Sequence, residues 1–366
     1  MRTFKKPRTV FLGGRGGVNR VGVGGDEPVT IQTMWKEPIL DIKENPAHLE
    51  RIRARLAALK TLGCDIVRFA VPDMRSAENF IDICRATSMP LVADIHFDHR
   101  LALKCLEGPV AAIRINPGNI GSRERVEAVV GACRDKGVAI RIGVNAGSLP
   151  KDLAARVEAG AMGRAAALSE AAARECAVFD ELGFDQFVVS MKASGVRETV
   201  EANEDFASRF DVPLHVGVTE AGPLITGVVR STLAFSRLLR EGIGSTIRVS
   251  LSSAPENEVV AGLEILRECG KRSGGVSLVS CPRCGRLGFD VHSFMERWQN
   301  ELLSMKKDIT VAVMGCVVNG PGEGRHADIG IAGAGNKAVI FKKGRVVRTI
   351  DMRDADEAFR EELSGL

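Results

Sequence analysis

The chain has 366 residues, of which 45% are hydrophobic and 26% are charged, and its 50 lysine and arginine residues nearly balance its 46 acidic residues. This length predicts two or three domains and is sufficient to bury a large core. The formal net charge of +4 and the aromatic content of 5% exclude a strongly basic chain and an aromatic stacking surface, so we expect no nucleic-acid partner.

We expect no export or membrane signal at the amino terminus. Residues 1–8 are basic, but no apolar stretch long enough for a signal peptide follows them. The run at 309–318 is among the longest apolar runs, and it is far shorter than the ~20 residues of a membrane span. We therefore expect a cytoplasmic protein without a membrane partner.

After a glycine-rich opening at 13–25, short apolar, β-branched runs alternate with segments of helical period. We predict strands at 29–34, 65–71, 90–95, 110–115, 138–144, 186–191, 213–218 and 246–251. The helical segments include 48–62, 122–136, 198–210 and 256–269, and 153–182 is long enough for two helices. Continuous apolar runs are typical of strands buried on both faces, and eight βα repeats predict a (β/α)8 TIM barrel over 1–270. A doubly wound open sheet is the structural alternative.

The pattern changes at 270–275, which has the composition of a linker. Beyond it we predict strands at 276–279, 309–314, 338–342 and 346–350, with helices at 291–305 and 354–363. These elements indicate a small α+β domain over 276–366. The glycine-rich stretch at 330–336 is not a P-loop, because Asn336 stands where that motif needs lysine.

Charged residues interrupt the predicted barrel strands. Five cations lie within or just after five different strands: Arg68, Arg114, Arg141, Lys192 and Arg248. In a closed barrel these side chains would converge, and buried cations need anionic partners. Asp94 and Glu220 are the internal candidates, too few for five cations, so the pattern predicts a phosphate or diphosphate site at the barrel mouth. The alternative is that the cations pair with helix carboxylates and bind no ligand.

Nine cysteines in a chain of this length do not suggest a secreted disulfide framework. Six stand singly in apolar segments, where we expect them to be buried: Cys64, Cys84, Cys105, Cys133, Cys176 and Cys269. The other three are Cys281 and Cys284, in the sequence CPRCG, and Cys316, in the sequence GCVVNGPGE.

Three interpretations of these three cysteines are open. A redox-active disulfide would need a thioredoxin-like setting that is missing here. A structural zinc site would need a fourth ligand such as Cys269 or His326. An iron–sulfur cluster with three cysteines and one weaker ligand suits the Gly/Pro-rich loop, whose backbone amides can approach cluster sulfurs.

Together these motifs resemble the bacterial two-domain 4-hydroxy-3-methylbut-2-enyl diphosphate synthases of the non-mevalonate isoprenoid pathway. The resemblance extends from VTIQTM (29–34) through VTEAG (218–222) and IRVSL (247–251) to the cysteine loops. The chain departs from the family pattern at WKEP (35–38) and at SSAP (252–255).

The resemblance implies a barrel followed by a small domain with a [4Fe-4S] cluster, in which Cys281, Cys284 and Cys316 are thiolate ligands and Glu323 is the fourth ligand. The implied reaction is the reductive ring opening and dehydration of 2-C-methyl-D-erythritol 2,4-cyclodiphosphate. Its two electrons would come from a flavodoxin or ferredoxin. A head-to-tail homodimer is also implied, with the cluster domain of one subunit closing over the barrel of the other.

Within that reaction we expect the five cations to bind the cyclic diphosphate, together with Asp94, Asn116 and Asn145. Our hypothesis is that Glu220 donates the proton to the departing hydroxyl and that Glu323 gives way when a substrate oxygen binds iron. The alternative for Glu220 is a salt bridge to an arginine, and His215 is expected to orient a neighbour. The alternative function is a barrel lyase or aldolase acting on a phosphorylated sugar, with a structural zinc domain.

Overall fold

The computed structural model describes residues 4–366 except Arg283 and Leu287, and it describes Glu323 by its backbone alone. The chain divides into two compact units, Met1–Arg272 and Ser273–Leu366. None of the helices in this described part is both long enough and apolar enough to cross a membrane.

The first unit is built around eight parallel strands. Their order is β8-β7-β6-β5-β4-β3-β10-β9, and a parallel bridge between Val189 and Leu214 links β8 to the segment leading into β9, so the sheet closes on itself. The strands are β3 (Thr30–Met34), β4 (Ile66–Ala70), β5 (Leu91–Asp94), β6 (Ala112–Ile115), β7 (Ala139–Asn145), β8 (Phe187–Lys192), β9 (His215–Val216) and β10 (Thr246–Ile247). Each of the eight predicted strands and the predicted TIM barrel are confirmed.

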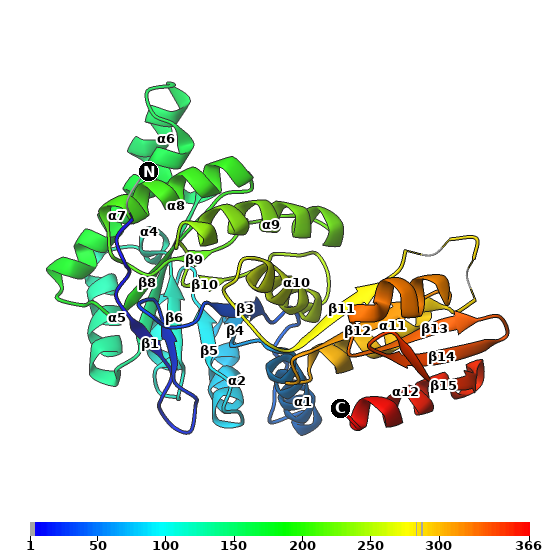
Figure 1. Ribbon diagram of the computed structural model, residues 1–366. Helices are drawn as coiled ribbons and strands as arrows, with labels where there is room; N and C mark the ends of the chain where they lie inside the picture. Colours follow the sequence, from blue (N-terminus) through cyan, green and yellow to red (C-terminus); the bar gives the residue numbers. More distant parts are fainter. Residues whose placement is uncertain (1–3, 283, 287) are drawn as a thin grey trace. The chain divides into compact units, whose positions relative to one another are not determined.

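Helices surround these strands (Figure 1). They are α1 (Pro46–Leu62), α2 (Met74–Arg85), α3 (His99–Cys105), α4 (Pro117–Ile120), α5 (Arg123–Lys136), α6 (Lys151–Glu158), α7 (Arg164–Glu181), α8 (Val196–Arg209), α9 (Leu224–Arg240) and α10 (Pro255–Glu268). The two helices expected between 153 and 182 are α6 and α7. Local signals set some ends: the carboxylate of Asp73 accepts a hydrogen bond from the backbone N–H of Ser76 and so caps α2.

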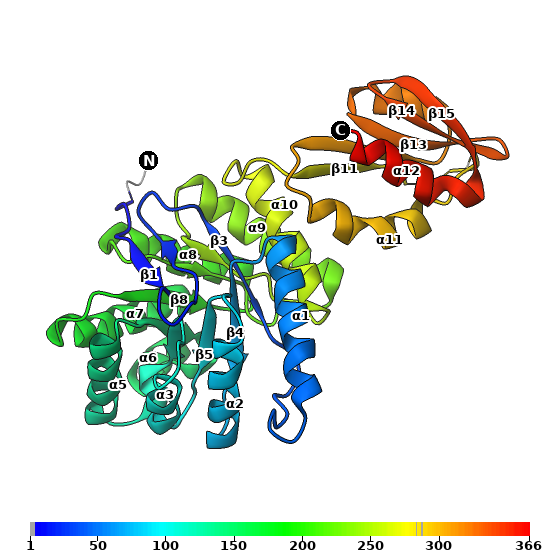
Figure 2. The same cartoon turned by 90° about the horizontal axis from the view of Figure 1, so that it is seen from below.

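The glycine-rich opening, for which no element was predicted, forms a short antiparallel hairpin of β1 (Val10–Leu12) and β2 (Val21–Val23). Gly13 has a φ of +76°, and a Cβ there would lie 2.2 Å from the carbonyl oxygen of Asn19, so the turn requires glycine. The hairpin packs on residues at the starts of the barrel strands, including Ile66, Val92 and Val188. It therefore closes the amino-terminal end of the barrel; in Figure 2, β1 lies beside β8.

The second unit is a five-stranded sheet of order β11-β12-β13-β14-β15, with the first three strands parallel and the last two antiparallel. Its elements are β11 (Val276–Ser280), α11 (Val291–Leu303), β12 (Ile309–Met314), β13 (Ile329–Ala334), β14 (Lys337–Lys342), β15 (Arg345–Asp351) and α12 (Ala355–Ser364). On one face of the sheet, Phe294 and Trp298 of α11 and Phe359 of α12 form an aromatic core. Glycines of the segment 316–328 pack on the other face, against Ala332 and Phe341.

The central strand β13 was not predicted, because its glycines are rare in strands. They are required by close packing. A Cβ on Gly330 would lie 2.2 Å from Cζ of Phe341, and a Cβ on Gly333 would lie 2.4 Å from the backbone of Gly288. The stretch at 330–336 is thus a buried strand and its turn, which brings β13 close to the loop after Cys284.

Candidate active site

The five cations marked by the sequence meet at the carboxyl-terminal ends of the barrel strands. Arg114 and Arg141 are direct neighbours across the β6–β7 ladder. Lys192 is the last residue of β8, Arg68 lies in β4, and Arg248 directly follows β10. Arg114, Arg141 and Lys192 are at most 8% exposed. The predicted convergence of the five side chains is therefore observed.

Asp94, at the end of β5, partly neutralises this cluster. Its Oδ1 accepts a hydrogen bond from Nη1 of Arg114 at 3.0 Å, and its Oδ2 lies 3.5 Å from Nε of Arg68. The ring of His96 lies 3.5 Å from the same carboxylate. Burial favours the protonated acid, but Arg68, His96 and Arg114 outweigh burial and hold the pKa of Asp94 far below its usual range. Asp94 is thus an ionised partner of the arginines.

The second buried carboxylate in the cluster is Glu258, which the sequence reading missed. It is on α10 and 1% exposed. Nη2 of Arg248 donates to its Oε1 at 3.0 Å, and Nε of Arg248 donates to its Oε2 at 3.2 Å. Nζ of Lys36 lies 2.9 Å from Oε1. A signal was present, because Glu258 occupies the buried face of α10 next to Val259 and one turn before Gly262.

Positive charge exceeds negative charge at this mouth. Nη1 of Arg141 donates to Gln32 at 2.6 Å, but Nε of Arg141 is buried with no hydrogen-bond partner among the described residues. Lys192 has no acidic partner in the described part of the chain. Burial, reinforced by Arg141 and Arg68, pushes the pKa of Lys192 well below its usual value, and burial lowers the pKa of Arg68 to about 10. The mouth is therefore suited to a polyanionic ligand.

Two glycines make room for these long side chains. A Cβ on Gly143 of β7 would lie 2.5 Å from Nε of Arg114. A Cβ on Gly217, just after β9, would lie 2.9 Å from Nζ of Lys192. Glycine at these two positions therefore leaves space for the side chains of Arg114 and Lys192.

The remaining barrel residues named from the sequence lie at or below the same mouth. Asn116, buried after β6, donates through Nδ2 to Oγ of Ser148 at 3.0 Å, and Asn145 is the half-buried last residue of β7. Glu220 is exposed in the loop after β9, at a φ of 50°, and has no ion-pair partner in the residues described, so the salt bridge considered for it is absent there. His215 is fully buried, and its Nδ1 lies 3.3 Å from Oγ1 of Thr246.

In the second unit, adjacent parallel strands bring two cysteine loops together. Cys281 follows β11 and Cys316 follows β12. The backbone N–H of Gly315 donates to Sγ of Cys281 at 3.0 Å. The backbone amides of Asn319 and Val318 and the side chain of Arg286 donate to the Cys316 sulfur and lower the pKa of that thiol, against the opposing effect of burial.

This donor set fits a sulfur-ligated centre. All nine cysteines, including Cys281, Cys284 and Cys316, are free thiols, and Cys284 is exposed. Backbone N–H groups aimed at sulfur are the interactions that stabilise thiolate ligands. The side chain of Glu323 lies outside the described residues, and no three His, Cys, Asp or Glu side chains within them are already grouped as a metal site.

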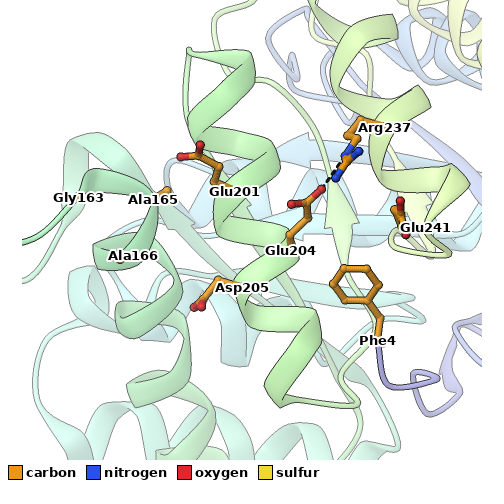
Figure 3. A pocket seen from close by; sticks show the side chains of 9 residues that line it. All are labelled: Phe4, Gly163, Ala165, Ala166, Glu201, Glu204, Asp205, Arg237 and Glu241. Carbon is orange, nitrogen blue, oxygen red and sulfur yellow. Dashed lines mark hydrogen bonds and ion pairs between the residues drawn. The ribbon is translucent and has the colours of Figure 1, made fainter. Parts of the chain in front are cut away.

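A hollow of about 660 Å³ elsewhere on the barrel is unsuited to an anionic substrate. It lies among the outer helices and is lined by Glu201, Glu204 and Asp205 of α8, by Glu241 and by Arg237 (Figure 3). Glu204 and Arg237 pair at 2.8 Å. The other carboxylates leave the lining negative, so it would repel a diphosphate.

Comparisons with known proteins agree with this division of the chain. Residues 15–263 match the GcpE TIM-barrel domain, and residues 277–365 match the GcpE protein C-terminal domain. The chain is 59% identical over 377 residues to the 4-hydroxy-3-methylbut-2-en-1-yl diphosphate synthase (flavodoxin) of Treponema pallidum (strain Nichols), covering 99% of this chain and 92% of that one. Proteins of the same name from Treponema denticola and Geobacter sulfurreducens are 56% and 46% identical, covering 100% and 95% of this chain and 100% and 96% of their own lengths.

Proposed function

Because the chain belongs to the GcpE family, we propose that it converts 2-C-methyl-D-erythritol 2,4-cyclodiphosphate to 4-hydroxy-3-methylbut-2-enyl diphosphate by reductive ring opening and dehydration. The family expected from the motifs is confirmed by these matches. The observation that carries the proposal is the barrel mouth, where Lys36 and the five strand cations face only Asp94 and Glu258 as carboxylate partners among the described residues.

The cations bind the diphosphate and stabilise charge that develops on it. When the ring C–O bond breaks, the freed phosphate oxygen gains negative charge. Arg141 and Lys192, whose hydrogen-bonding capacity is largely unused by the described residues, are positioned to receive that charge. Asn116 and Asn145, at the same mouth, offer amide groups to the substrate hydroxyls.

Glu220 is the residue we assign as proton donor to the departing hydroxyl. Its carboxyl group is exposed at the mouth, and no basic side chain of the described residues pairs with it. It follows β9, whose neighbour β10 leads directly into Arg248. An unpaired carboxyl group at the mouth that holds the five cations can transfer a proton without first breaking a salt bridge.

We infer that Cys281, Cys284 and Cys316 hold a [4Fe-4S] cluster and that Glu323 supplies its fourth ligand. Such a cluster supplies electrons one at a time and an iron able to act as a Lewis acid. The free thiols and the N–H groups directed at two of the sulfurs support this assignment. We propose a flavodoxin, or a ferredoxin in its place, as electron donor, since the relatives' names include flavodoxin.

We also propose that the protein acts in the cytoplasm as a homodimer and has neither nucleic-acid nor membrane partners. The small net charge of +4 and the low aromatic content support the absence of a nucleic-acid partner.

The decisive experiment replaces one proposed ligand and one matched cysteine. Anaerobically purified wild-type protein should be brown and should form product with reduced flavodoxin. Cys316→Ser should lose activity and most of the visible absorption, because a thiolate ligand is removed. Cys269→Ser, which alters a half-buried cysteine of the first unit, should retain both. Full activity of Cys316→Ser would refute the ligand assignment, and colourless wild-type protein with stoichiometric zinc would favour the lyase alternative.

A further inference from the structure

Glu258 differs from the other charged groups of the mouth in its origin. The cations and Asp94 stand on or next to barrel strands, whereas Glu258 belongs to α10 in the outer layer. Its side chain is completely buried beside Arg248. A helix carboxylate that reaches the strand ends places one negative charge among cations that repel each other.

Both oxygens of Glu258 are fully used. Oε1 accepts from Nη2 of Arg248 and from the backbone N–H of Leu251, both at 3.0 Å. Oε2 accepts from Oγ1 of Thr33 at 2.7 Å and from Nε of Arg248 at 3.2 Å. Arg248 is thereby gripped along one edge, and its Nη1 donates to Oγ of Ser250 at 2.8 Å. Three hydrogen bonds, two to Glu258 and one to Ser250, thus fix the orientation of the guanidinium plane.

Beside Glu258, a lysine joins the two stretches expected from the sequence to depart from the family pattern, 35–38 and 252–255. Lys36, from 35–38, binds Oε1 at 2.9 Å and donates to the carbonyl oxygens of Leu251, at 2.6 Å, and Ser253, from 252–255. Arg55 of α1 forms a second link between the same parts of the chain, because it pairs with both Glu37 and Glu256. The two unusual stretches therefore bind each other beside Arg248.

We propose that Glu258 is a positioning residue that presents Arg248 to the diphosphate of the substrate, with Lys36 locking the loop after β3 onto the same carboxylate. The inference rests on the proposed function, because it takes the mouth to be the diphosphate site. Without Glu258, repulsion by the neighbouring Arg68, Arg141 and Lys192 would displace the Arg248 guanidinium.

A double-mutant cycle tests this inference on the full chain, with inorganic diphosphate as ligand and calorimetry as readout. Glu258→Gln keeps the shape of the side chain and removes its charge, and it should raise Kd about tenfold or more. Arg248→Gln should also raise Kd. The double variant should bind no more weakly than Arg248→Gln alone, because Glu258 acts through Arg248. A purely structural role would lower the melting temperature and leave Kd unchanged.

Two controls make each outcome decisive. Glu204→Gln, which removes a buried, arginine-paired carboxylate from α8 in the outer hollow of Figure 3, should leave Kd unchanged. If Arg248→Gln binds diphosphate as the wild type does, the proposed binding site is wrong. If Arg248→Gln binds weakly but Glu258→Gln does not, the positioning role is wrong. Should Glu258→Gln fail to fold, Thr33→Val removes one bond to Oε2 and should raise Kd about threefold, only while Arg248 is present; an unchanged Kd overturns the inference.

Discussion

The buried cations of the barrel mouth show how single residues prepare a site for its ligand. Arg141 and Lys192 are buried without carboxylate partners among the residues described, an arrangement that costs several kcal/mol in the free protein. An anionic ligand that pairs with them removes that cost. Under the proposed function, the unfavourable burial would thus contribute binding energy for the diphosphate.

Lys192 gives this arrangement a measurable pH dependence. Burial and neighbouring cations place its pKa in the folded protein well below the usual 10.5, so the unfolded chain binds this proton more tightly. The free energy of unfolding should therefore rise with pH between the lowered pKa of the folded protein and 10.5. A bound diphosphate favours the charged ammonium and raises the pKa again. Diphosphate binding should therefore take up protons at pH values between the lowered pKa of the free protein and the higher pKa of the complex.

Calorimetry in two buffers of different ionisation heat measures that uptake. Lys192→Met should reduce it, whereas Lys104→Met, on the surface of α3 and paired with Glu107, should not. Identical binding heats for wild-type protein in both buffers would contradict the expectation.

At the scale of the element, β13 shows that close packing can override strand propensity. Gly330 and Gly333 are poor strand formers, yet any larger residue would collide with Phe341 or with the backbone of Gly288. Ile329 and Ile331 are the only strong β formers in the strand, so the packing around its glycines largely specifies it.

Gly330→Ala should therefore destabilise the second unit, by about 1–3 kcal/mol, because the added methyl group overpacks the Phe341 ring. The chain has two tryptophans, Trp35 in the first unit and Trp298 in the second. In a Trp35→Phe background, Trp298 fluorescence should report a lower denaturation midpoint. The matched variant Gly285→Ala, at a described position with open space around it, should not change the midpoint.

The eight barrel strands could be predicted because each is a continuous apolar run, and the cations stood out because they interrupt those runs. Their partners could not be predicted as readily. Glu258 is only ten residues from Arg248 and lies on the apolar face of a helical pattern, but its pairing with Arg248 depends on how α10 packs against the barrel. The hairpin strands β1 and β2 are too short to give a periodic signal. Cys281, Cys284 and Cys316 were found through their motif, which depends little on tertiary packing.

At the scale of the whole molecule, each unit has its own core. Phe294, Trp298 and Phe359 close the core of the second unit around residues that all belong to Ser273–Leu366. A fragment of residues 273–366 should therefore fold alone, with cooperative denaturation and the blue-shifted emission of a buried Trp298. A fragment with red-shifted emission and no unfolding transition would show that the core needs the first unit.

The hairpin at the amino-terminal end of the barrel bears on how the protein would work over many turnovers. Because apolar side chains cover that end, substrate and product would enter and leave at the carboxyl-terminal ends of the strands. The product keeps the diphosphate of the substrate, so both would bind the same guanidinium groups. A new substrate molecule could then bind only after the product has left. Accumulated product would therefore inhibit turnover, and its consumption by later reactions would relieve that inhibition.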